Sequence, residues 1–230
     1  MKANLRTLLR CGIISSIYYA AINILVPLGF DGYSYVTQTV SELSAIGAPT
    51  RTIWISLASA YVILFAAFGA GVRKLGKESS RLKALGTIII VYSVFNIYWP
   101  PMHLRGSVGS LTDTLHITWA MVTVCLMIAM MITGMLLLGR SFRNYTIATL
   151  AVHLIFGILT TREGVNIATN GPTPWIGVWE RINIGAFMLW VAVLSHKLLS
   201  AGEVFHVPVK VDRQARHQLK TGGNKNQFDP

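Results

Sequence analysis

The chain has 230 residues, of which 53% are hydrophobic and only 13% are charged, and its formal net charge is +11. Soluble domains carry about 25% charged residues, so this composition, with a mean hydropathy of +0.53, argues against an ordinary soluble domain. A charge this positive can indicate nucleic-acid binding. Here the cations gather at the ends of apolar segments and in a polar tail, so we expect contact with membrane lipids and no nucleic acid.

Six apolar segments follow one another along the chain. They cover residues 8–28, 52–72, 83–99, 113–138, 145–161 and 180–199. Runs of about 20 apolar residues match the ~30 Å hydrocarbon core of a bilayer. We therefore predict an all-α integral membrane protein in which residues 1–200 form a bundle of six transmembrane helices. Residues 201–230 are polar without an apolar period, and we predict a disordered tail there.

The Lys and Arg residues alternate between the connectors of these segments. Only four of the 20 lie in the first, third and fifth connectors, namely Arg51, Arg105, Arg162 and Arg181. The other 16 precede the first segment, follow the last, or lie in the second and fourth connectors. Because positive charge stays on the cytoplasmic side during insertion, both termini are predicted to be cytoplasmic. The compact, loop-poor chain leads us to expect the cytoplasmic membrane of a prokaryote.

The first outer connector, residues 29–51, has a helical pattern of its own. Apolar residues recur there at three- to four-residue spacing, at Val36, Val40, Leu43 and Ile46. Thr39 and Glu42 have the spacing of a capping box. We therefore predict a short amphipathic helix in the first outer loop. Glu42 either caps this helix or pairs with an outer arginine.

A second capping-box pattern, Ser110 to Asp113, opens the fourth segment. His116 lies three residues after Asp113, on the same helix face, and His103 is close enough in sequence to reach both. The preferred interpretation makes Asp113 a capping acid with His116 as its hydrogen-bonded neighbour. Alternatives are a catalytic zinc bound by His103, Asp113 and His116, or a carboxylate that orients a histidine base. Zinc is not favoured, because the spacing lacks the specificity of an HExxH motif.

Further ionisable residues fall in or beside the outer loops. They are Glu42, Arg105, Arg162, Glu163, Glu180 and Arg181. Such groups are costly near a membrane unless they are paired or hydrated. They either pair with one another and hold the loops together, or form a site where arginines bind a carboxylate or phosphate in bidentate fashion. His153 stands alone in the fifth segment, and we expect it to bond a neighbouring helix.

Residues 32–49, GYSYVTQTVSELSAIGAP, resemble the signature of the membrane family called domain of unknown function 998. The stretch 100–106, followed by 112–116, is similar to a second block of that family, and Glu180-Arg181 is a third point of similarity. The resemblance covers roughly residues 8–199. It implies a helix, a Tyr- and Ser-rich outer loop ending in Ser-Glu-Leu, and further helices, and it brings no activity with it.

Two classes of function remain open from the sequence. The first is binding, sensing or moving a lipid or small amphiphile at an outward-facing polar site. The arginines of that site would be paired with acids among Glu42, Asp113, Glu163 and Glu180. The alternative is a metal-dependent membrane enzyme acting on a lipid headgroup through His103, Asp113 and His116. The first class is preferred because the sequence contains no specific catalytic motif.

Overall fold

The computed structural model describes residues 3–106 and 109–204, the last four by their backbone only. This part contains two 3-10 turns, η1 (Val26–Gly29) and η2 (Ser41–Ser44), and no strand. Its six α-helices are α1 (Ala3–Leu25), α2 (Arg51–Leu75), α3 (Ser80–Phe95), α4 (Leu111–Met135), α5 (Arg140–Gly164) and α6 (Ile176–Val204). The predicted all-α class is confirmed. Residues 201–204 form the end of α6, and the rest of the predicted tail lies outside the described residues.

Five of these helices are long and apolar enough to cross a membrane. The candidate spans are Ala3–Gly29, Arg51–Leu75, Leu111–Met135, Arg140–Gly164 and Ile176–Ser200. The remaining helix, α3, has 16 residues and is therefore about 24 Å long at 1.5 Å per residue. The chain is a multi-pass membrane protein. The count of six spans and the cytoplasmic position of the termini stay predictions.

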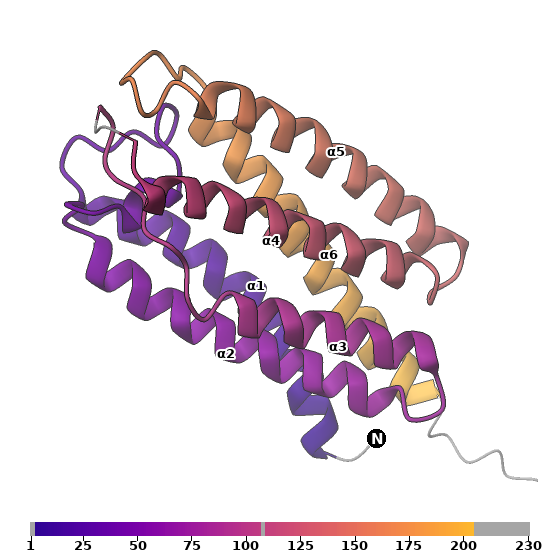
Figure 1. Cartoon of the computed structure of the whole chain (residues 1–230). Helices are drawn as coiled ribbons and strands as arrows, with labels where there is room; N and C mark the ends of the chain where they lie inside the picture. Colours follow the sequence, from indigo (N-terminus) through magenta and orange to yellow (C-terminus); the bar gives the residue numbers. More distant parts are fainter. Residues whose placement is uncertain (1–2, 107–108, 205–230) are drawn as a thin grey trace, which may run out of the picture.

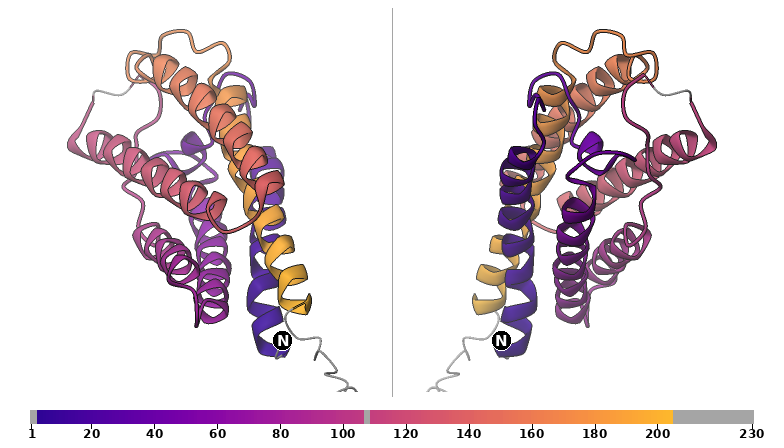
Figure 2. Two further views of the ribbon diagram at one scale, coloured as in Figure 1. Left: turned by 90° about the vertical axis from the view of Figure 1, so that its right-hand side faces the viewer. Right: turned by 90° about the vertical axis from the view of Figure 1, so that its left-hand side faces the viewer.

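The helices form a closed ring. Each packs against its neighbours in the sequence, and α1 packs against α6, so the two ends of the membrane domain lie side by side (Figures 1 and 2). Large side chains that are almost fully buried fill the ring, among them Leu9, Phe65, Phe68, Phe187 and Trp190. Their burial between helices orients α1, α2 and α6 around one core.

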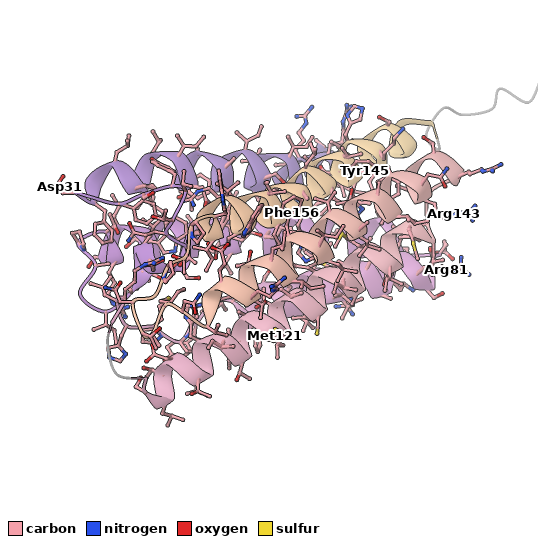
Figure 3. The ribbon with its side chains drawn as sticks, turned by 90° about the horizontal axis from the view of Figure 1, so that it is seen from above. Asp31, Arg81, Met121, Arg143, Tyr145 and Phe156 are labelled. Atoms are coloured by element: carbon pink, nitrogen blue, oxygen red, sulfur yellow. The ribbon has the colours of Figure 1, made fainter. Side chains whose placement is uncertain are left out.

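The bundle has two chemically different ends. At one end lie three loops, which we call the first (26–50), second (96–110) and third (165–175) loops, and we call this the loop end (Figure 1). The opposite end carries the start of α1 and the short α2–α3 and α4–α5 turns. In Figure 3, Asp31 lies at the loop end, whereas Arg81 and Arg143 lie at the opposite end. The ionisable residues singled out in the outer connectors thus come together at one end.

The amphipathic helix predicted in the first loop is not confirmed. The chain makes only the one-turn η2 there, because backbone groups of Val36 and Val40 bond to α6 and so cannot continue a helix. Gly177 N donates to Val36 O at 2.9 Å, and Val40 N donates to the Glu180 carboxylate. The predicted apolar face is accordingly divided. Val40 and Leu43 are buried, whereas Val36 and Ile46 are each 40% exposed.

Candidate functional site

Glu42 of the first loop is fully buried and forms an ion pair with Arg105 of the second loop. Arg105 Nε donates to Glu42 Oε1 at 2.5 Å, and Nη2 donates to Oε2 at 3.0 Å. The backbone N–H and the hydroxyl of Thr39 also donate to Oε2, at 2.7 and 2.9 Å. The capping-box bonds of Thr39 with Glu42 and the pairing of Glu42 with an outer arginine therefore both exist, and the carboxylate receives a two-pronged guanidinium contact.

Arg105 also ties the second loop to the other two loops. Its Nη1 donates to Thr173 Oγ1 of the third loop at 2.6 Å, and its Nη2 donates to Thr37 O of the first loop at 2.5 Å. Thr173 Oγ1 in turn donates to Thr37 O at 2.9 Å. Each of the three guanidinium nitrogens thus has an acceptor within the protein. This arginine acts as a joint between loops, with no nitrogen left over for a ligand.

Arg181, near the start of α6, holds the first loop differently. Its Nη1 donates to the carbonyl oxygens of Tyr35, Gln38 and Gly177 at 3.0, 3.2 and 3.0 Å. Its Nη2 donates to Tyr33 Oη at 2.8 Å, and its Cζ lies 5.1 Å from the centre of the Tyr35 ring, within cation–π range. The remaining nitrogen, Nε, is buried and has no hydrogen-bond partner among the described residues.

The Tyr33 phenol is fixed in its protonated form. Burial raises the pKa of Tyr33 well above its ordinary value, and the neighbouring Arg181 only partly opposes that shift. The hydroxyl can therefore donate to Thr39 O, at 2.7 Å, while it accepts from Arg181. This pair of bonds links α6 to the first loop without a carboxylate.

Glu180 does not form the predicted pair with an arginine in the described part of the chain. Its carboxylate accepts from Val40 N and, at 3.5 Å, from Ser41 Oγ. The first loop lies against this turn of α6 so closely that a side chain at Gly177 would collide with the carbonyl oxygens of Gln38 and Tyr35. The first loop therefore packs directly against the start of α6.

Arg162 and Glu163, at the end of α5, stay apart from the other two arginines. Glu163 accepts hydrogen bonds from Trp175 N at 3.1 Å and Trp179 Nε1 at 3.0 Å. Arg162 is exposed, and the structure describes no ion pair or hydrogen bond for it. The three arginines therefore do not gather around one place, as a shared anion site would require.

The Ser110–Asp113 capping box is confirmed at the start of α4. Asp113 Oδ2 accepts from Ser110 N and Oγ at 2.9 and 2.8 Å, and Oδ1 accepts from His103 N at 2.7 Å. His103 Nδ1 lies 3.0 Å from Oδ2 and 3.3 Å from Ser110 Oγ. In a catalytic Ser-His-Asp triad the serine and the acid use opposite ring nitrogens. Here both face the same one, as expected of a structural cap.

His116 takes no part in this group, so the predicted bond between His116 and Asp113 is wrong. The imidazole is buried, with Nδ1 2.7 Å from Pro100 O and the Trp99 indole N–H against the ring. Because Asp113 turns back to cap its helix, it cannot reach forward to His116. Residues 3–106 and 109–204 contain no group of three His, Cys, Asp or Glu residues placed to hold a metal.

His153 bonds a neighbouring helix, as the sequence analysis expects. It is fully buried in the middle of α5. Its Nδ1 lies 3.3 Å from Asn183 O of α6, and Asn183 Nδ2 donates to His153 O at 2.5 Å. This pair joins α5 to α6 inside the bundle.

A groove of about 430 Å³ between α1 and α6 escaped the sequence analysis. Asn23, Ile24, Tyr35 and Arg181 line it toward the loop end. Its remaining lining residues are Ser16, Ile17, Tyr19, Ala20, Ile184, Gly185, Met188, Leu189 and Ala192. The only sequence signal for it was an isolated amide, Asn23, in an otherwise apolar segment.

Asn23 and Arg181 give this groove an unusual polar end. Asn23 is only 9% exposed, and its Oδ1, like Arg181 Nε, is buried and has no hydrogen-bond partner among the residues the structure describes. Buried polar atoms are nearly always paired, so two orphans lining one groove suggest a ligand. One is an acceptor and the other a donor.

The comparisons with known proteins agree with the resemblance of the loops. No curated protein and no solved structure matches the chain. The sequence profile of a family described as "Protein of unknown function (DUF998)" matches residues 13–197. The match spans most of the chain and runs from α1 to α6, including the three loops. The chain therefore belongs to the DUF998 family of proteins of unknown function.

Proposed function

We propose that this membrane protein binds a single-chain amphiphile in the α1–α6 groove. The hydrocarbon chain lies along the apolar walls, and the polar end group lies beside Arg181 and Asn23. The volume of about 430 Å³ falls within the roughly 300–1,000 Å³ of small-molecule sites. Apolar walls with a few polar groups at one end are also the usual form of such sites.

The observation that carries this proposal is the pair of unpartnered polar atoms at the end of the groove. A buried donor or acceptor without a partner costs about 1–3 kcal/mol. A ligand that provides the missing partners recovers that free energy, whereas an annular lipid chain without a matching end group does not. The other arginine of the loop cluster, Arg105, offers no such opportunity because Glu42 and the loops occupy its nitrogens.

We do not propose the metal-dependent enzyme as a second function. Its three residues are divided, with His103 and Asp113 in the cap of α4 and His116 held by Pro100 O and Trp99. The supported role is binding, and it is compatible with sensing or moving the bound amphiphile.

We further propose that the groove opens toward the outer leaflet, with both termini cytoplasmic, in the cytoplasmic membrane of a prokaryote. The support is the sequence, in which 16 of the 20 Lys and Arg residues fall outside the connectors that form the loop end. A cysteine-free background needs only Cys11→Ser and Cys125→Ser. An impermeant maleimide should then label Asp31→Cys in intact right-side-out vesicles, and Arg143→Cys only after permeabilisation. The reverse pattern would refute this orientation.

Binding in the groove is tested with a variant that fills it. Gly185 lines the groove, and a Cβ added there meets no atom within 4 Å, so Gly185→Leu adds bulk to the groove from a position with room for a Cβ. The matched control is Gly164→Leu, because Gly164 on α5 has equally open surroundings outside the groove. The probes are tritiated oleyl alcohol and oleyl sulfate, added to protein in phosphatidylcholine nanodiscs and measured by scintillation proximity.

We expect saturable binding of at least one probe to the wild type and to Gly164→Leu, and at least tenfold weaker binding to Gly185→Leu. Neither probe binding saturably would overturn the proposal. Equal binding to Gly185→Leu and the wild type would overturn it as well.

A further inference from the structure

We infer that the amphiphile bound in the α1–α6 groove carries a neutral hydroxyl end group and not an anionic one. This inference rests on the proposed function and narrows it to a class of ligand. It depends on which hydrogen-bonding groups Asn23 and Arg181 still have available at the end of the groove. A hydroxyl fits both, whereas a carboxylate, phosphate or sulfate fits only one.

The unpartnered atom of Asn23 is an acceptor. Its Nδ2 donates to Tyr19 O, one turn earlier in α1, at 2.9 Å. Flipping the amide would place Oδ1 against that carbonyl oxygen, so the hydrogen-bond network fixes the orientation of the side chain. The unpartnered atom is therefore a carbonyl-type oxygen, which attracts a donor and repels an anion.

Arg181 offers Nε–H as a donor that has no partner in the described part of the chain. Anions bind arginine best through two parallel N–H bonds, which require Nε with one Nη or both Nη together. Here Nη1 donates to three backbone carbonyls and Nη2 donates to Tyr33 Oη. An anion held by Nε together with one Nη would have to share that Nη with its described partners in the first loop and α6. Nε is the one guanidinium nitrogen without a partner among the described residues.

One hydroxyl completes both residues at once, since it accepts from Arg181 Nε and donates to Asn23 Oδ1. Both atoms are buried, so a ligand reaches them only when this end of the groove opens locally. A carboxylate or sulfate, which only accepts, would satisfy Arg181 and leave its negative charge facing the Asn23 oxygen.

The rest of the groove suits the hydrocarbon chain of such an alcohol. Below the polar end, the two walls come from Ile17 and Ala20 of α1 and from Ile184, Met188 and Leu189 of α6. Ser16, farther from the loop end, has its hydroxyl bonded to Gly12 O at 2.9 Å and so does not need a ligand partner. The polar side-chain atoms that could take a ligand as their partner therefore lie at the loop end of the groove.

The test compares oleyl alcohol with oleyl sulfate, which have the same chain and differ in the end group. Binding to wild-type protein in phosphatidylcholine nanodiscs is measured at equal mole fractions of probe in the bilayer. We expect oleyl alcohol to bind at least tenfold more tightly. Asn23→Leu, which keeps the size but removes the acceptor, should weaken alcohol binding at least fivefold and change sulfate binding less than twofold.

The outcomes separate the two proposals. Oleyl sulfate binding as tightly as the alcohol, with Gly185→Leu still blocking it, would overturn the hydroxyl inference and leave the groove function standing. No saturable binding of either probe would overturn both. If Asn23→Leu fails to fold, the ratio of the two probes on the wild type decides alone. Gly164→Leu must keep the wild-type ratio.

Discussion

Two arginines hold the first loop in place, and they differ in how many of their guanidinium nitrogens have a hydrogen-bond partner. Arg105 meets a fully buried carboxylate, Glu42, and places all three guanidinium nitrogens on groups of the protein. Arg181 meets no carboxylate among the described residues and keeps one buried nitrogen unpartnered. The polar cluster at the loop end thus combines a structural joint with the arginine to which we assign the proposed ligand.

The neighbouring acids explain this difference. Glu42 faces Arg105 across the loops, and the guanidinium neutralises a carboxylate that is fully buried. Glu180 directly precedes Arg181 in the sequence, but its carboxylate turns to Val40 N and Ser41 Oγ. The comparison shows that ionisable residues gathered at one end of a bundle need not serve one purpose.

The largest expected effect is on the joint. Arg105→Gln leaves Glu42 buried without its counter-charge, and breaking a buried pair in this way costs roughly 3–5 kcal/mol. We expect the free energy of unfolding, measured by chemical denaturation in detergent micelles, to fall by about that amount.

Arg162→Gln is the matched control for that variant. Arg162 is exposed and has no described partner, so its replacement should change the unfolding free energy by no more than about 0.5 kcal/mol. Equal unfolding free energies of the Arg105 and Arg162 variants would show that the ion pair does not stabilise the folded protein. Arg105 could then no longer be distinguished from Arg181 as a structural joint.

A smaller effect is expected where the first loop meets α6. Gly177→Ala forces a Cβ against the carbonyl oxygens of Tyr35 and Gln38, and overpacking of this kind costs about 1–3 kcal/mol. Gly185→Ala, on the same helix but in open space, should be neutral or stabilising by up to ~1 kcal/mol. The same denaturation assay compares them, and a Gly177 variant as stable as the Gly185 variant contradicts the close contact.

The smallest effect concerns the cap of α4. Asp113→Ala removes the capping acid and its bonds to His103, which should lower the unfolding free energy by about 1–2 kcal/mol. Asp31→Ala serves as its control, because Asp31 is an exposed acid at the same end of the bundle. Thermal unfolding of the three proteins side by side measures the difference. If Asp113→Ala unfolds at the same temperature as Asp31→Ala, the capping box does not stabilise the protein.

Local sequence patterns predicted the features of this molecule that are set by residues close to one another in the chain. The apolar runs located the six helices, although α3 ends at Phe95, before the end of the predicted segment 83–99. Ser110 and Asp113 stand three residues apart, so their capping box could be predicted directly. The pairing of Arg105 with Glu42 was one possibility among many, because 63 residues separate them.

Contacts between distant parts of the chain explain what the sequence analysis missed. In the first loop, the pattern favoured a helix, but α6 takes up the backbone groups of Val36 and Val40. The groove depends on α1 packing against α6, which brings Asn23 beside a helix that begins 153 residues later. No spacing within either segment reveals that Asn23 and Arg181 line the same groove.

Thermal unfolding of the wild type and Gly185→Leu in nanodiscs, with and without oleyl alcohol, tests the central claim most directly. A ligand at 100 times its dissociation constant stabilises the folded protein by about 2.7 kcal/mol. We predict that oleyl alcohol raises the unfolding temperature of the wild type. We predict no rise for Gly185→Leu, which should itself unfold no earlier than the wild type. An equal rise in both proteins would contradict a ligand site between α1 and α6.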